Sequence, residues 1–194
     1  MIFRLFRRDP MAGTIDALYG AIVAQARNPA FYLTYGAPDT AEGRFDMIVL
    51  HLVLLCRRLG RETGTDAQLA RALSQQVFDM FCSDMDHNLR EMGVGDLTVP
   101  KRMRRVGEAF FGRLQVYEQA LASDDGEELV GALARNVFAA GESTTSGRRL
   151  AAYVREAAGR LDRTPLAALT AAQLDFPDPD AMANSQEPAH ETRP

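Results

Sequence analysis

The chain has 194 residues and a mass of 21.4 kDa, which fits one domain whose hydrophobic core is large enough to fold without disulfides or structural metals. Hydrophobic residues make up 46% and charged residues 25% of the sequence, a composition that excludes disordered and fibrous proteins. The formal net charge of −4 excludes a globally basic nucleic-acid-binding protein, so we expect no nucleic-acid partner. Two cysteines, Cys56 and Cys82, are too few for a secreted disulfide scaffold and indicate a reducing compartment.

Apolar residues recur with the period of an α-helix along almost the whole chain. The spacing predicts helices over residues 14–27, 29–32, 41–59, 65–93, 98–122, 127–140 and 148–161, and a short one from residue 165. No segment alternates with the period of a strand. The sequence therefore predicts an all-α, single-domain bundle of about seven to eight helices over residues 11–176. The helix 41–59 is apolar on all sides in its middle and is expected to be the central buried helix.

Short polar motifs mark several helix ends. Thr65 and Gln68 have the spacing of a capping box and predict the start of the long helix, with Leu69 on its inward face. Gly93 predicts the end of that helix, and Thr98 the cap of the next. From residue 177 the chain is rich in Pro, Asp, Asn, Ser and Glu, so we expect a disordered tail over 177–194.

The N-terminal segment, residues 1–10, is basic and amphipathic. An arginine close to the start prevents a continuous apolar signal sequence. The segment is either a short surface anchor or a functionless terminus. The candidate membrane-surface residues are Phe3, Arg4, Phe6, Arg7 and Arg8. The longest apolar run, residues 47–56, is too short to span a bilayer.

Three side chains with metal-ligating chemistry share one face of the helix 65–93. Asp84, His87 and Glu91 follow one another at intervals of three and four residues, which suits a divalent metal or acid–base work. An ordinary solvated helix face explains the same pattern, and no second helix carries matching ligands. Nucleotide-binding and zinc-hydrolase motifs are absent from the sequence, which therefore predicts no cofactor and no catalytic residues.

A basic cluster opens the helix 98–122. Lys101, Arg102, Arg104 and Arg105 crowd its first turns, where the helix dipole disfavours cations. The cluster is either a docking patch for an acidic or phosphate-bearing partner or a solvated helix start.

Two further features lie inside helices. His51, in the apolar run, is more typical of a core histidine bonded to a backbone carbonyl or a carboxylate than of a cofactor ligand. Gly107 and Gly112 each cost about 1 kcal/mol relative to alanine in a helix interior. Close approach of another helix, internal or from a partner, would explain them, and internal packing is the commoner case.

Two segments of the chain resemble the ubiquinol–cytochrome c chaperone family, the assembly factors of the respiratory cytochrome bc complex. They are YGAPDTAEGRFDMIVLHLVLLCRRL, residues 35–59, and FDMFCSDMDHNLREMGVGDLTVPKRMRRVGEAFFGR, residues 78–113. The resemblance runs from Thr14 to Gly141, and LREMGVGD is its most specific part. It implies a non-enzymatic assembly factor that binds newly made cytochrome b or its complex, working with a second small assembly factor. We expect a cytoplasmic protein, peripheral on the inner membrane, or on the matrix side if mitochondrial.

An acidic helix face suits the Lys- and Arg-rich loops of an inner-membrane client, and the basic helix start and N-terminus suit anionic lipid. The first candidate docking surface consists of Asp84, Asp86, Arg90, Glu91, Gly93, Gly95, Asp96 and Lys101. The second, in a predicted turn and the helix start that follows it, consists of Gly36, Pro38, Asp39, Gly43, Arg44 and Asp46. Two other classes stay open: a metal-dependent helical-bundle enzyme using Asp84, His87 and Glu91, and a plain peripheral membrane-binding protein anchored by residues 1–8.

Overall fold

The computed structural model describes residues 11–138 and 144–186, and these two ranges contain helices and no β-strand. The helices are α1 (Ala12–Ala26), α2 (Ala30–Leu33), α3 (Ala41–Gly60), α4 (Ala67–Glu91), α5 (Val99–Ala122), α6 (Gly126–Asn136), α7 (Thr144–Arg163), α8 (Leu166–Thr170) and α9 (Pro179–Gln186). The all-α, single-domain prediction is confirmed. Within the described ranges α9 adds one helix that the sequence pattern did not predict.

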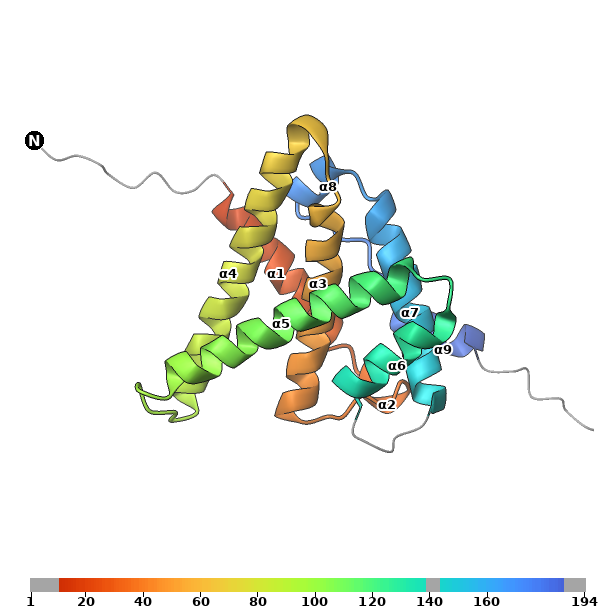
Figure 1. The fold of residues 1–194 in the computed structure, drawn as a ribbon, viewed down its shortest axis with the longest axis horizontal. Helices are drawn as coiled ribbons and strands as arrows, with labels where there is room; N and C mark the ends of the chain where they lie inside the picture. The colour runs from red at the N-terminus through yellow and green to blue at the C-terminus, as the bar shows by residue number, and fades with distance from the viewer. Residues whose placement is uncertain (1–10, 139–143, 187–194) are drawn as a thin grey trace, which may run out of the picture.

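Helix α3 is the centre of the fold, as its all-round apolar pattern predicts. Every residue from Met47 to Leu59 is buried except Arg58, which is partly buried. Helices α1, α4, α5 and α7 pack around it (Figure 1). Thr40 caps its start, because its hydroxyl accepts a hydrogen bond of 3.0 Å from the backbone N–H of Gly43.

His51 is a core residue, as predicted. Its Nδ1–H donates to the carbonyl oxygen of Met47 at 2.8 Å, and its Nε2 accepts from the hydroxyl of Tyr153 at 2.8 Å. The side chain is fully buried, and burial lowers its pKa to about 4. The imidazole is therefore neutral at pH 7 and joins α3 to α7.

The chain after residue 176 packs on the domain, so the predicted start of the disordered tail is wrong. The amide of Gln25 donates to the carbonyl of Pro177 at 2.9 Å, and the hydroxyl of Tyr35 donates to that of Pro179 at 3.0 Å. Composition was misleading here because this segment contributes backbone carbonyls that buried donors need, rather than large apolar side chains. Residues 187–194 lie outside the described ranges.

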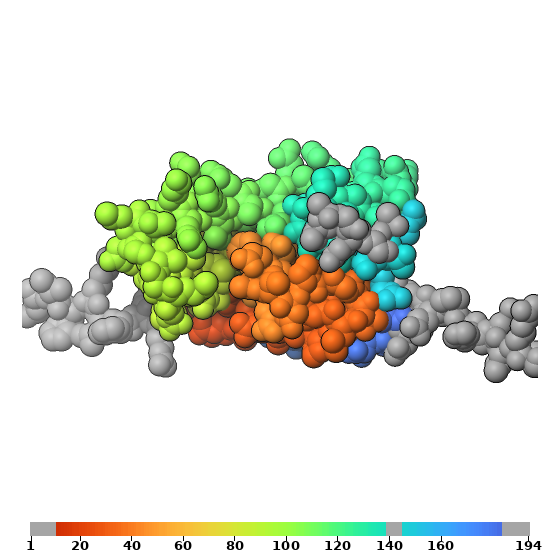
Figure 2. Space-filling view, turned by 90° about the horizontal axis from the view of Figure 1, so that it is seen from below, coloured from red at the N-terminus to blue at the C-terminus, as the bar shows by residue number. Residues whose placement is uncertain are grey.

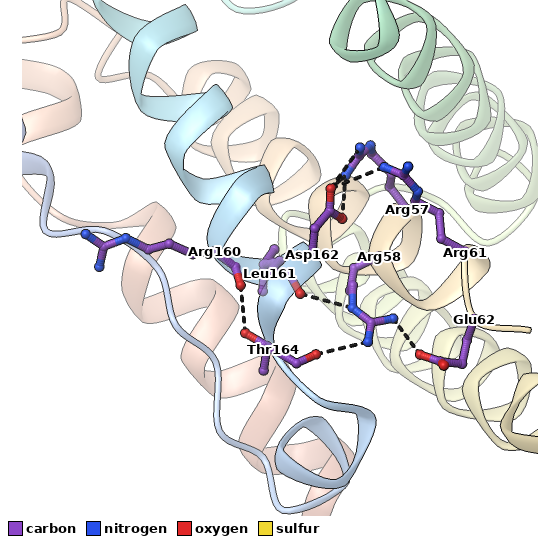
Figure 3. Close-up of polar contacts among 8 residues, drawn as sticks. All are labelled: Arg57, Arg58, Arg61, Glu62, Arg160, Leu161, Asp162 and Thr164. Carbon is purple, nitrogen blue, oxygen red and sulfur yellow. Dashed lines mark hydrogen bonds and ion pairs between the residues drawn. The ribbon is translucent and has the colours of Figure 1, made fainter.

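Polar contacts tie the last turns of α3 and α7 together (Figure 3). Arg57 is 7% exposed and donates to both carboxylate oxygens of Asp162, at 2.9 and 3.1 Å. Arg61 donates to the same carboxylate at 3.2 Å. Arg58 donates to the backbone carbonyls of Leu161 and Thr164. The arginines of α3 therefore bind the carboxylate and carbonyl groups at the end of α7 and fix the relative position of the two helices.

The ends of α4 follow the predicted pattern only in part. A short 3₁₀ helix, Gly64–Asp66, includes Thr65, so Thr65 lacks the extended backbone that a capping residue needs and the predicted capping box is wrong. Leu69 is 41% exposed rather than inward. Gly93 does end the helix: it has a φ of +77°, and its N–H donates to the carbonyl of Arg90.

Two more predictions concern α5. Thr98 precedes the helix as predicted, although its side chain makes no capping hydrogen bond. A methyl group added at Gly107 or Gly112 would meet no atom within 4 Å outside its own helix backbone. The prediction of close internal helix packing at these glycines is therefore wrong, and both glycines face open space.

Candidate functional site

The proposed metal ligands on α4 are not brought together. The hydroxyl of Tyr19, on α1, donates to Asp84 at 2.6 Å, so this carboxylate is turned toward α1. His87 and Glu91 form a separate exposed pair, with 3.1 Å between Nε2 and Oε1. Across the described ranges, no three histidine, cysteine, aspartate or glutamate side chains are placed to hold a metal ion. The metal-dependent enzyme therefore receives no support from this geometry.

Asp84 stabilises the fold rather than offering a free carboxylate. Burial and the hydrogen bond to Asp84 raise the pKa of Tyr19 above its ordinary value. The second oxygen of Asp84 accepts from the amide of Asn88 at 3.2 Å. Of the predicted docking residues, Asp84 is thus the one most engaged in holding α4 against α1.

The residues where α4 ends and α5 begins, 86–105, form a projecting corner of the molecule that we call the α4–α5 tip (Figure 1). Arg90 organises it by donating to Asp86, with 2.7 Å between Nε and Oδ2, and to Asp96. The hydrogen bond from Arg90 holds the pKa of Asp86 below its usual range. Gly95 contributes its carbonyl, which accepts from the backbone N–H of Thr98 at 2.7 Å. Arg90 therefore links the end of α4 to the loop that follows it.

The α4–α5 tip also exposes two large apolar side chains that sequence reasoning missed. Met92 is 69% and Leu97 98% exposed to solvent. The basic side chains Lys101, Arg102, Arg104 and Arg105 are exposed next to them. The available signal was the occurrence of two large apolar residues inside a short loop of otherwise small and polar residues.

The second candidate surface divides into scaffold and exposed residues. Gly36 has a φ of +78°, and a Cβ at Gly43 would lie 2.0 Å from the carbonyl oxygen of Pro38, so both glycines shape the turn. Asp39 and Arg44 form an exposed ion pair at 2.7 Å. Both side chains are more than half exposed to solvent.

Asp46, the last member of the second surface, belongs to the interior. Its carboxylate pairs with Arg113 of α5, and only 19% of its side chain is exposed. Burial raises the pKa of Asp46 to about 6 against the opposite effect of Arg113. Arg113 also donates to the carbonyl of Asn136 at 3.2 Å, so this pair joins α3, α5 and α6.

A shallow pocket of about 290 Å³ lies beside Asp39 and Arg44. It is lined by Arg27, Pro29, Tyr32, Leu33, Asp39 and Arg44. Leu33 is 84% exposed, and sequence reasoning missed it because α2 has too few residues to show a periodic pattern. The pocket thus combines the exposed apolar surface of Leu33 with two arginines.

The two surfaces face the same end of the molecule. In the view from below, the yellow-green α4–α5 tip and the orange segment around α2 and the start of α3 are both turned toward the viewer (Figure 2). The predicted membrane-surface residues Phe3, Arg4, Phe6, Arg7 and Arg8 lie outside the described ranges. Within those ranges, none of the helices combines the length and the apolar character that crossing a bilayer requires.

Comparison with known proteins shows the family. The model of the ubiquinol-cytochrome C chaperone family matches residues 33–176, which include both candidate surfaces. The ubiquinol-cytochrome c reductase complex assembly factor 1 of Drosophila melanogaster is 28% identical over 160 residues, covering 78% of this chain and 59% of the fly protein. The mouse protein of the same name is 26% identical over 121 residues, covering 62% of this chain and 39% of its own. This chain therefore spans less than two thirds of these relatives.

A solved structure agrees with the sequence matches. The crystal structure of the Cbp3 homolog from Brucella abortus superimposes with a TM-score of 0.79 at 37% identity, covering 93% of this chain and 98% of that one. The fold, the family match and the sequence similarity over most of the chain all agree. The chain therefore belongs to the ubiquinol-cytochrome C chaperone family.

Proposed function

We propose that this protein binds newly made cytochrome b and assists assembly of the ubiquinol–cytochrome c reductase complex without catalysing a reaction. The proposal places it on the cytoplasmic side of the inner membrane, or on the matrix side if mitochondrial. Family membership supports the assembly role. The observation that carries the docking site is that two charged regions with bare apolar side chains face one end of the molecule (Figure 2).

The chemistry of the client fits these surfaces. Loops of inner-membrane proteins that face the cytoplasm are rich in Lys and Arg. At the α4–α5 tip, Asp86 and Asp96 are already neutralised by Arg90. Glu91 is 64% exposed, and its partner His87 carries a charge only when protonated. Glu91 is therefore the carboxylate of the tip best placed to meet a basic loop, while Leu33 and its pocket suit an apolar helix end.

The experiment is recovery of cytochrome b by the tagged protein from its own detergent-solubilised membranes. We compare wild type with Glu91→Arg and Leu33→Asp, and leave Asp84 untouched because its bond to Tyr19 makes it structural. Glu118→Arg on α5 and Leu69→Asp on α4 are matched controls at exposed positions. We expect each test variant to lower recovery about tenfold, the loss typical of an interface residue worth more than 1 kcal/mol.

Two outcomes would contradict parts of the proposal. Absence of cytochrome b from the wild-type eluate contradicts the function. Normal recovery by both test variants contradicts the docking surface and leaves the function standing. A second small assembly factor, which the proposal includes, should appear in the same eluate.

A further inference from the structure

The α4–α5 tip carries more positive than negative charge, with five Lys and Arg side chains against three Asp and Glu side chains over residues 86–105. Asp86 and Asp96 share one partner, Arg90; Glu91 lies beside His87, which carries a charge only when protonated; and Arg104 pairs with Glu108. In the described ranges, Lys101, Arg102 and Arg105 are exposed and form no ion pair. Three cations therefore face solvent at this corner of a chain whose net charge is −4.

These cations do not stabilise the helix that carries them. They lie in the first two turns of α5, where the helix dipole disfavours positive charge. They also repel one another, because Lys101 and Arg105 are four residues apart on one helix face. An external anionic surface would offset both costs.

The apolar side chains of the tip extend into solvent and do not line a pocket. Leu97 is 98% exposed, so no concave surface surrounds it, and Met92 is 69% exposed. The tip projects from the body of the molecule (Figure 1). A protein partner would need a socket for each side chain, whereas a fluid bilayer interface accepts isolated apolar side chains flanked by cations.

We propose that the α4–α5 tip binds an anionic lipid bilayer, with Leu97 and Met92 in the interface and Lys101, Arg102 and Arg105 on the lipid headgroups. The inference deepens the proposed function, since a tip held at the bilayer brings the acidic end of α4 to the loops of a membrane-embedded client. The tests use lipid vesicles that contain no cytochrome b, so lipid binding is measured separately from the capture of cytochrome b.

The first test uses the absence of tryptophan from this chain. In a full-length Leu97→Trp variant, the single indole reports the environment of the tip. We expect a blue shift of its emission with vesicles of phosphatidylcholine and phosphatidylglycerol, and none with phosphatidylcholine alone. Leu69→Trp, at the other end of α4, is the control and should not shift. An unshifted Leu97→Trp spectrum with anionic vesicles overturns the proposal.

The second test is cosedimentation of the full-length protein with the same vesicles. A triple change of Lys101, Arg102 and Arg105 to Gln should lower the partition coefficient about a hundredfold, since each cation near an anionic surface contributes about fivefold. A triple change of Arg71, Arg135 and Arg163 to Gln removes as many exposed cations from other helices and should change it little. High salt should weaken wild-type binding.

Two alternatives give different results. If changing Arg4, Arg7 and Arg8 to Gln abolishes binding and the α4–α5 tip variant binds normally, the N-terminal segment is the anchor and the proposal is overturned. If the tip variant binds vesicles normally but loses cytochrome b, the tip docks a protein and the proposal is also overturned.

Discussion

The buried histidine predicts a specific loss of stability in acid. His51 donates to the carbonyl of Met47 and accepts from the hydroxyl of Tyr153, so a proton on Nε2 would break the second bond inside the core. The ring also packs edge-on against Phe31 and Phe176. Among the residues that the structure describes, no carboxylate bonds to the ring to compensate a charge there. The perturbation is therefore the protonation of His51.

The sign and size follow from the pKa values. Burial lowers the pKa of His51 from 6.5 to about 4 in the folded protein. Between pH 6.5 and 4, His51 binds a proton in the unfolded chain but not in the folded one, so the free energy of unfolding decreases as the pH falls toward 4. Between pH 7.5 and 4.5 the loss amounts to about 2.5 kcal/mol.

A second buried group opposes this effect in the wild type. Burial raises the pKa of Asp46 from 3.8 to about 6, so the folded protein binds the extra proton and stability is lost as the pH rises through that range. The wild-type profile alone therefore hides the contribution of His51. The difference between wild type and His51→Gln removes the Asp46 contribution, because both proteins carry it.

The assay is urea unfolding of wild type and His51→Gln from pH 7.5 to 4.5. We expect His51→Gln to be the less stable protein at pH 7.5, and the gap to shrink by about 2.5 kcal/mol at pH 4.5. A gap that stays constant over this range would refute the assignment of His51 as a neutral core residue.

Four further substitutions test the packing. Gly43→Ala should destabilise the protein by about 1–3 kcal/mol in thermal unfolding, because its Cβ would overlap a backbone carbonyl, and an unchanged Tm would show that the turn relaxes freely. Gly107→Ala and Gly112→Ala should each stabilise α5 by up to about 1 kcal/mol in urea unfolding, since both face open space, and a loss of stability would reveal a hidden contact. Asp162→Ala should cost about 3–5 kcal/mol, because it leaves the buried guanidinium of Arg57 paired with no carboxylate, and a cost below 1 kcal/mol would show that water reaches this group.

Much of the fold was predictable because helix signals are local. The apolar run from Met47 identified the central helix, since only a helix surrounded by others is apolar on every side. Gly93 marked a helix end because the left-handed backbone it adopts suits glycine. The capping box at Thr65 is also a local signal, and the prediction was wrong. The motif requires an extended residue at Thr65, where the chain forms a 3₁₀ turn instead.

The candidate site was less predictable because it depends on which side chains the packing leaves uncovered. Asp84 and Glu91 look alike in the sequence, yet Tyr19 of another helix binds the first and leaves the second exposed. Leu33 and Leu97 are large apolar residues of the kind that usually enter the core, yet the structure leaves both exposed to solvent.

The sequence by itself determined the helical class, the buried central helix and the charged composition of the α4–α5 tip, since period and composition are properties of neighbouring residues. Tertiary structure alone decided the docking of residues 177–186 and the partners of Asp84 and Arg57. It also decided the solvent exposure of Met92 and Leu97. These depend on groups far apart in the chain, and no local pattern records them.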